Sequence, residues 1–85
     1  MISNKEAAQK AIEYLENFYD ETKNILLEEV ELTDDNKFWL ITLSYDSKLP
    51  MSALDIAVGK NNRSYKIFEV STTKGEVKSM KIRKI

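Results

Sequence analysis

Carboxylates form the densest group of side chains in this sequence that could do chemistry. They are Glu28, Glu29, Glu31, Asp34 and Asp35. Alternate residues of a strand share a face, so Glu29 and Glu31 could together hold a hard cation such as Mg²⁺ or Ca²⁺. The run lacks the glycine and the distal glutamate of an EF-hand loop. We therefore interpret it as a solvated strand face followed by a polar turn, and we predict no metal site.

Missing residue types narrow the chemistry further. The 85 residues include no His and no Cys, so the commonest general base, the thiolate nucleophile and the usual zinc ligands are absent. With only two glycines there is no phosphate-binding or dinucleotide-binding loop. We predict no catalytic residue and no cofactor, and we expect that the protein is not an enzyme.

Cationic residues gather near the end of the chain. Residues 1–59 carry 5 lysines and 12 acidic residues, a net charge of −7, whereas residues 60–85 carry 8 Lys or Arg and 2 acidic residues, a net charge of +6. The basic stripe of the last predicted strand consists of Lys78, Lys81, Arg83 and Lys84. Such a stripe could contact nucleic-acid phosphates, but lysines on an edge strand also prevent aggregation. Nucleic-acid binding is therefore an alternative function and not the leading one.

The uneven charge also suggests what the partner is. If the acidic and basic segments do not pair within one chain, they could pair between two, giving a homodimer or a complex with a complementary protein. The basic strand could instead pair with the acidic first strand of its own chain, through contacts that contribute little when exposed. We predict that the partner is another protein or a second copy of the chain.

An amphipathic helix is predicted from about Asn4 to about Thr22. Ser3 and Glu6 have the spacing of a capping box, in which the hydroxyl of the first residue accepts from the amide of the second. The apolar residues that follow have helical spacing and should face a core. They are Ala8, Ala11, Ile12, Leu15, Phe18 and Tyr19.

Period-two patterning begins at Leu26 and predicts a hairpin. Its strands are residues 26–33 and 38–45, joined by a polar turn. The odd positions of the second strand form one heavy apolar face, which should lie under the helix. These positions are Trp39, Ile41, Leu43 and Tyr45.

A second hairpin is predicted near the end of the chain. Its strands are residues 65–71 and 76–84, and Gly75 occupies the turn position that needs a positive φ. The apolar phase of the last strand shifts, which predicts a β-bulge near Lys78 and Ser79. Residues 46–63 show no clean period, and we expect them to be partly ordered and to cover an edge or face of the sheet.

One helix can cover only one face of a sheet, so apolar side chains are left over on the other. These are the predicted partner-binding residues, Leu27, Phe38, Leu40, Tyr65 and Ile67. The alternative is that apolar residues of the segment 46–63 fold over them, since large exposed apolar patches are rare on monomers.

The predicted fold class is α+β: one N-terminal helix on an antiparallel sheet of three or four strands, in the order α-β-β-variable segment-β-β. Eighty-five residues form a single domain, residues 1–85. The N-terminus has no apolar region typical of a signal peptide, and no apolar run approaches ~18 residues, so we expect a cytoplasmic protein without a membrane span.

The layout resembles that of small cystatin-like and PepSY-type domains, which pair one helix with a curved sheet. The residues that carry the resemblance are Phe68, Glu69 and Val70, followed by a turn at residues 73–77 that is similar to Thr-Gly-Glu-Val but is interrupted by Lys74. PepSY domains are often linked to peptidase regulation. No inhibitory loop is matched, so the resemblance implies the layout and no function.

By elimination, the leading prediction is a non-enzymatic protein-interaction module, such as a small inhibitor, an immunity-type protein or an accessory protein. The alternative is a nucleic-acid-associated accessory protein that uses the basic C-terminal strand.

Overall fold

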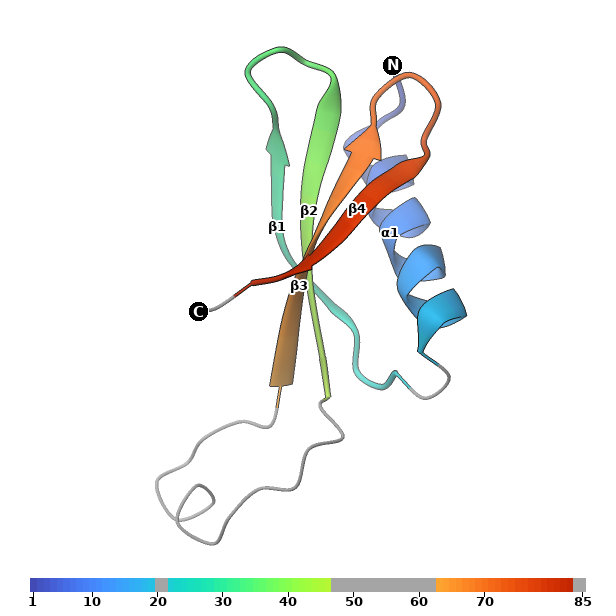
Figure 1. Ribbon diagram of the computed structural model, residues 1–85, viewed down its shortest axis with the longest axis vertical. Helices are drawn as coiled ribbons and strands as arrows, with labels where there is room; N and C mark the ends of the chain where they lie inside the picture. The colour runs from blue at the N-terminus through green and yellow to red at the C-terminus, as the bar shows by residue number, and fades with distance from the viewer. Residues whose placement is uncertain (20–21, 47–62, 84–85) are drawn as a thin grey trace, which may run out of the picture.

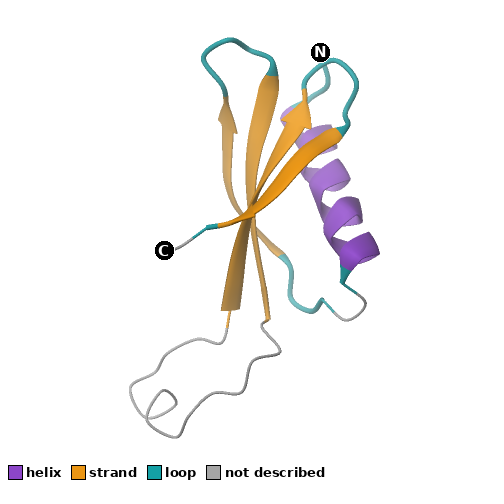
Figure 2. Cartoon of the chain, viewed as in Figure 1, coloured by secondary structure: helices purple, strands orange, loops and turns teal. Residues whose placement is uncertain are grey.

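A computed structural model describes residues 1–19, 22–46 and 63–83. Within them the chain forms one helix and four strands, α1 (Asn4–Phe18), β1 (Leu26–Leu32), β2 (Phe38–Asp46), β3 (Arg63–Ser71) and β4 (Val77–Ile82). Neighbouring strands are antiparallel in the order β1-β2-β3-β4, and α1 lies against one face (Figures 1 and 2). The predicted α+β fold class is confirmed. The expectation for residues 47–62 lies outside the described residues.

Helix α1 begins as the sequence predicts and ends earlier. The Ser3 hydroxyl accepts a hydrogen bond from the Glu6 amide at 3.1 Å, as in the predicted cap. The helix ends at Phe18 and not near Thr22, because Tyr19 is extended at φ −125° and its amide closes the last turn on the Leu15 carbonyl. The side chains that α1 buries are Ala7, Ala8, Ala11 and Leu15.

The prediction that the end of the helix stripe fills the core is wrong. Phe18 is 62% exposed and Tyr19 is 38% exposed. The chain leaves the helix at Tyr19, so Leu15 is the last fully buried side chain of α1. Phe18 instead stacks on the Tyr14 ring, with the ring centroids 4.7 Å apart. Its apolar surface remains largely in solvent.

The helix-side face of the sheet carries the predicted core. Ile41, Leu43 and Tyr45 of β2 are buried beside Phe68 and Val70 of β3. Ile41 lies opposite Phe68 in the β2–β3 register, and Trp39 lies opposite Val70. Side chains directly opposite on neighbouring strands contact each other, so these pairs form a continuous apolar layer under the helix.

Two β-bulges adjust which side chains reach that layer. Glu69 pairs with Ser79 and Val70 with Val77, so Lys78 is the extra residue, and the predicted bulge is confirmed. A second bulge, which the sequence did not predict, leaves Glu28 extra between Leu27 and Glu29. Each bulge reverses the inward and outward alternation of the residues beyond it.

A buried threonine joins three distant segments at one end of the sheet. The Thr72 hydroxyl donates to the carbonyl of Asn36 or Lys37, at 2.8 and 3.0 Å, in the β1–β2 turn, and its carbonyl accepts from the Ile2 amide at 2.7 Å. The Ile2 carbonyl in turn accepts from the Trp39 indole nitrogen at 3.1 Å. These bonds hold the start of α1 against both hairpin turns, which sets the helix position.

The helix packs mainly on β2 and β3 and lies away from β1 (Figure 1), whose residues are largely exposed. A helix is about 10 Å across, whereas the outer strands of a four-stranded sheet lie about 14 Å apart. Leu27 and Val30 are opposite Leu43 and Ile41 on the helix side, yet they are 49% and 36% exposed. The sheet therefore has exposed apolar side chains on its helix side as well, at the β1 edge.

Two truncations in one helix test this account of the core. Leu15→Ala should lower the free energy of unfolding by about 2–5 kcal/mol, because it empties a fully buried site. Phe18→Ala should change it by less than about 1 kcal/mol, because the ring is mostly in solvent. Urea unfolding followed by Trp39 fluorescence measures both. Equal losses would contradict the early helix end.

Candidate functional site

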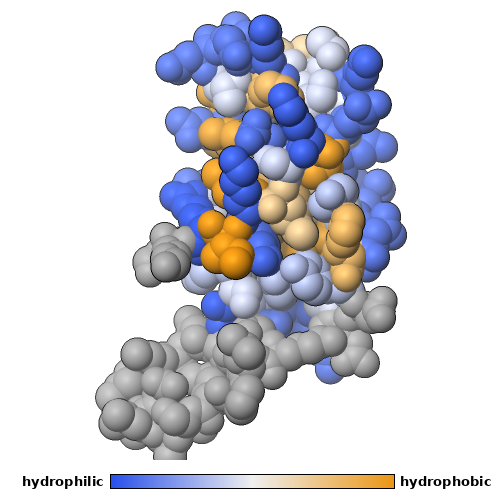
Figure 3. Space-filling model, in the orientation of Figure 1, coloured by the Kyte–Doolittle hydropathy of each residue, from blue (hydrophilic) through white to orange (hydrophobic). Residues whose placement is uncertain are grey.

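The sheet face away from α1 is the candidate site. Phe38, Leu40, Tyr65 and Ile67 alternate with the buried residues of β2 and β3, so all four lie on this face as predicted. Each is half-buried, although the helix does not cover them. Polar residues share the face, because Glu69 lies opposite Leu40 and Thr42 lies opposite Ile67. Figure 3, which shows one side of the molecule, likewise has apolar residues interrupted by hydrophilic ones.

Leu27, the fifth predicted residue of this face, lies on the opposite side. The unpredicted bulge at Glu28 shifts the alternation of β1, so Leu27 is opposite Leu43 on the helix side. Simple period-two counting from Glu29 places Leu27 with Glu29 and Glu31, and one extra residue reverses that assignment. The placement of Leu27 on the uncovered face is therefore wrong.

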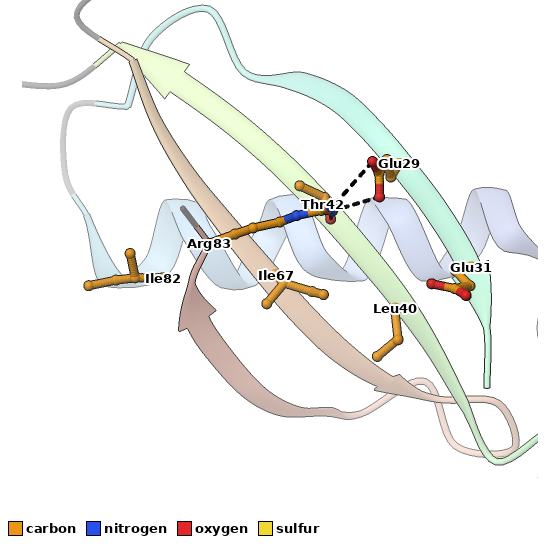
Figure 4. Close-up of a pocket in the computed structure, with 7 residues that line it drawn as sticks. All are labelled: Glu29, Glu31, Leu40, Thr42, Ile67, Ile82 and Arg83. Carbon is orange, nitrogen blue, oxygen red and sulfur yellow. Dashed lines mark hydrogen bonds and ion pairs between the residues drawn. The ribbon is translucent and has the colours of Figure 1, made fainter. Parts of the chain in front are cut away.

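A groove of about 420 Å³ crosses the uncovered face (Figure 4). Its lining combines apolar side chains with two carboxylates, a hydroxyl and a guanidinium. The residues are Glu29, Glu31, Leu40, Thr42, Ile67, Ile82 and Arg83. Each of the four strands contributes at least one of these side chains. Arg83, the residue that follows β4, contributes another.

Arg83 ties the groove together across the sheet. Its backbone amide donates to the Tyr65 carbonyl at 3.0 Å, which continues the β3–β4 pairing by one residue. Its guanidinium donates to the Thr42 hydroxyl at 2.7 Å and to both carboxylate oxygens of Glu29, at 2.6 and 3.1 Å. A bidentate ion pair of this kind has a defined geometry. The side chain of a residue beyond the last strand thus reaches the first strand.

The ion pair shifts the protonation of both partners. The hydrogen bond from Arg83 is the main cause that lowers the pKa of Glu29, and the positive charge of Arg83 adds to it. The hydrogen bond to Glu29 likewise raises the pKa of Arg83, with the negative charges of Glu29 and Glu31 acting in the same direction. Both groups are therefore ionised at neutral pH.

A second arginine makes a similar bridge at the other end of the face. Arg63 donates to Asp46 at 2.9 Å, to the Ser44 hydroxyl at 2.8 Å and to the Asn24 carbonyl at 2.6 Å. The Ser44 hydroxyl donates to Glu28 at 2.9 Å. The bulged Glu28 is thus held over the sheet rather than free in solvent. This cluster links the segment that enters β1 to the strands β2 and β3.

The predicted basic stripe is largely engaged with its own chain. Besides Arg83, Lys81 lies 3.9 Å from a Glu69 carboxylate oxygen, and the Lys78 ammonium lies 4.9 Å from the centroid of the Phe38 ring. Lys84 lies outside the described residues. β1 and β4 are opposite edges of the sheet, so the acidic and basic strands do not pair through their backbones. Among the described residues, the predicted charge pairing between these segments is made by the Arg83–Glu29 ion pair.

Glu29 and Glu31 share a face, as their spacing predicts, because they lie opposite Thr42 and Leu40. Among the described residues, no group of three or more His, Cys, Asp or Glu could hold a metal ion. Asp35, at the end of the acidic run, accepts from the Thr33 hydroxyl and the Lys37 amide, and these bonds lower its pKa. The run therefore ends in a turn that its own carboxylate stabilises.

The residues predicted for the uncovered face include the groove floor, Leu40 and Ile67, and leave out Thr42. Leu40 and Ile67 follow from the alternation of apolar and polar residues in β2 and β3. Thr42 and the two arginine bridges do not, because each joins residues far apart in the chain and depends on the strand register. The only available signal was the position of Arg63 and Arg83 at strand ends, where a long side chain can lie across its neighbours.

Comparison with known proteins yields no relative. No protein-family model, no curated protein and no solved structure matches the chain. The helix formed by the described residues is not long and apolar enough to span a membrane.

Glu29→Gln tests the ion pair through its pH dependence. A carboxylate whose folded pKa is depressed stabilises the fold above its unfolded pKa, and this contribution is lost as the pH falls through the folded pKa. The variant should therefore unfold at a lower urea concentration than wild type at pH 7. The difference should shrink below the ordinary glutamate pKa of about 4.3 and vanish at lower pH.

Glu31→Gln is the matched control, because Glu31 lies on the same strand face and makes no ion pair with the described residues. It should have a smaller effect at pH 7. A Glu29→Gln effect that persists unchanged at acid pH would show that the carboxylate charge is not its source.

Proposed function

We propose that the chain is a non-enzymatic protein-interaction module whose contact surface is the sheet face away from α1. The observation that carries the proposal is the groove on that face, with its floor of Leu40 and Ile67 and its charged border of Glu29, Glu31 and Arg83. Interaction surfaces commonly combine a small apolar centre with a polar border.

The groove floor suits the side chains of a protein partner. Leu40 and Ile67 are half-buried, and a partner's apolar side chain would remove their remaining surface from water. The border is already ordered by the Arg83–Glu29 pair and its bond to Thr42. A contact surface that is ordered before binding loses less conformational entropy when the complex forms.

The chemistry on this face favours binding over catalysis. Catalysis would have to use carboxylates, lysines, hydroxyls or tyrosines, because the chain has no His and no Cys. Glu29 is engaged by Arg83, and Tyr45 is in the core, where burial raises the pKa of its phenol. We therefore propose no catalytic residue and no cofactor.

The nucleic-acid alternative has less support. Arg83, Lys81 and Lys78 each lie beside an acidic or aromatic group of their own chain, which reduces the positive field available to phosphates. A specific observation that favours nucleic acid is lacking among the described residues. If labelled DNA or RNA bound tightly and the binding fell with salt, the alternative would replace the protein-interaction proposal.

Two finer expectations belong with the proposal. The likeness to cystatin-like and PepSY-type domains is supported by the layout of one helix on an antiparallel sheet, and by nothing further. A cytoplasmic location is supported by the lack of cysteines, which fits a reducing compartment.

Leu40→Ser and Leu27→Ser form a matched pair that tests the surface. Both change a leucine to serine on neighbouring strands, but the first alters the groove and the second the helix side. Tagged full-length chains expressed in the native host would be purified and their partners quantified by mass spectrometry. Leu40→Ser should reduce the recovery of a specific partner about tenfold, as expected when a contact worth about 1.4 kcal/mol is lost.

Leu27→Ser should leave that recovery within about twofold of wild type, a change of under about 0.5 kcal/mol. Near-ultraviolet circular dichroism of Trp39 would confirm that both variants are folded. Equal recovery with both variants, or no specific partner with wild type, would contradict the proposal.

A further inference from the structure

The two edge strands of the described sheet carry opposite charges. β1 has Glu28, Glu29 and Glu31, whereas β4 and the residue after it have Lys78, Lys81 and Arg83. β1 and β4 are the edges because the strand order is β1-β2-β3-β4. An edge strand presents backbone amides and carbonyls that can pair with another strand.

The backbone groups that point outward can be assigned from the hydrogen-bond pattern. The Thr33 amide donates to the Phe38 carbonyl, and alternate residues of an antiparallel strand point their backbone groups the opposite way, so Val30 and Leu32 point away from β2. Likewise the Arg83 amide donates to Tyr65, so Ile82 and Met80 point away from β3. In the sheet that the structure describes, no strand pairs with the outward-pointing backbone groups of these apolar residues.

The side chains of these outward-pointing residues lie on the same face of the sheet. Val30 lies opposite Ile41, and Met80 lies opposite Phe68, so both are on the helix side. Ile82, opposite Lys66, follows the same alternation, and at the edge of the sheet its largely exposed side chain also borders the groove. Val30 is 36% exposed and Ile82 is 72% exposed, so both still have apolar surface to bury.

Strand direction allows the opposite edges of two copies to meet. All neighbours in the sheet are antiparallel, so β4 runs antiparallel to β1. A second copy placed in the same orientation beside β1 therefore presents its β4 antiparallel to β1, with both helices on the same side. Four strands at about 4.8 Å spacing separate the two helices by about 19 Å, more than the ~10–12 Å diameter of a helix.

We propose that this chain associates head to tail through its sheet edges, with β1 of one copy pairing with β4 of a second copy. In the register that places Val30 opposite the second copy's Ile82, Leu32 lies opposite Met80 and Glu31 lies opposite Lys81. The outward-pointing backbone groups then face each other, apolar side chains meet on the helix side, and the carboxylate meets the ammonium on the groove side. The bulged residues Glu28 and Lys78 fall outside these three pairs.

Like-with-like pairing is disfavoured by the same charges. A symmetric β1–β1 contact centred on Val30 places Glu29 opposite Glu31 of the other copy, and a β4–β4 contact centred on Ile82 places Lys81 opposite Arg83. Like charges directly opposite on neighbouring strands are destabilising. The contact between different edges leaves one edge of each type free, so further copies can add to the assembly.

Charge reversal on each edge provides the test. The weight-average mass of the wild-type chain, from sedimentation velocity, should rise between low micromolar and millimolar concentration and should fall when salt is added. Glu31→Lys and Lys81→Glu should each weaken association about tenfold or more. Glu16→Lys, the same charge change on the exposed side of α1, is the control and should have no such effect.

An equimolar mixture of Glu31→Lys and Lys81→Glu should regain the wild-type mass, since each variant supplies the unaltered edge that the other lacks and reverses the charge at the remaining contact. Unfolded variants would not regain it. The proposal is overturned if wild type stays monomeric throughout, if both reversals leave association unchanged, or if the mixture remains monomeric.

Discussion

A helix about 10 Å across cannot cover both faces of a sheet, nor the full width of one whose outer strands lie about 14 Å apart. In this chain the helix is held over β2 and β3 by the bonds that join Thr72, Ile2 and Trp39. The helix-side face is therefore dry at its centre, the other face keeps half-buried apolar side chains such as Leu40 and Ile67, and β1 is left at the border. The location of every candidate binding surface follows from this arrangement.

Because the helix covers only one face of the sheet, the chain must keep the other face from exposing a continuous apolar surface. A face of apolar side chains alone would favour aggregation, whereas here Arg63 reaches from β3 to β2 and Arg83 reaches from the end of β4 to β2 over it. Their aliphatic stems add apolar contact while their charged ends stay hydrated or paired. On this face Leu40 and Ile67 lie in a groove with a charged border, which favours a specific contact over a general one.

Periodicity in the sequence predicted the helix, the four strands and the bulge at Lys78, because each leaves a local mark in the spacing of apolar residues. The turn at Gly75 was predicted from the glycine itself, which adopts the positive φ expected there. Periodicity did not predict the early end of α1 or the bulge at Glu28, which depend on where the chain must leave the helix and enter the sheet. Leu27 was placed on the wrong face for that reason. The Arg83–Glu29 pair joins residues 54 positions apart and follows from strand register, which periodicity alone does not determine.

The central claim is that the two faces of one sheet differ in their access to solvent, with Leu40 and Ile67 open and Ile41 and Leu43 closed. Paramagnetic relaxation of methyl groups by a soluble gadolinium chelate measures this access directly in the full chain. Strong enhancement at Leu40 and Ile67, with little at Ile41 and Leu43, is the predicted result. Equal protection of all four would show that the face away from the helix is covered, which would contradict the account.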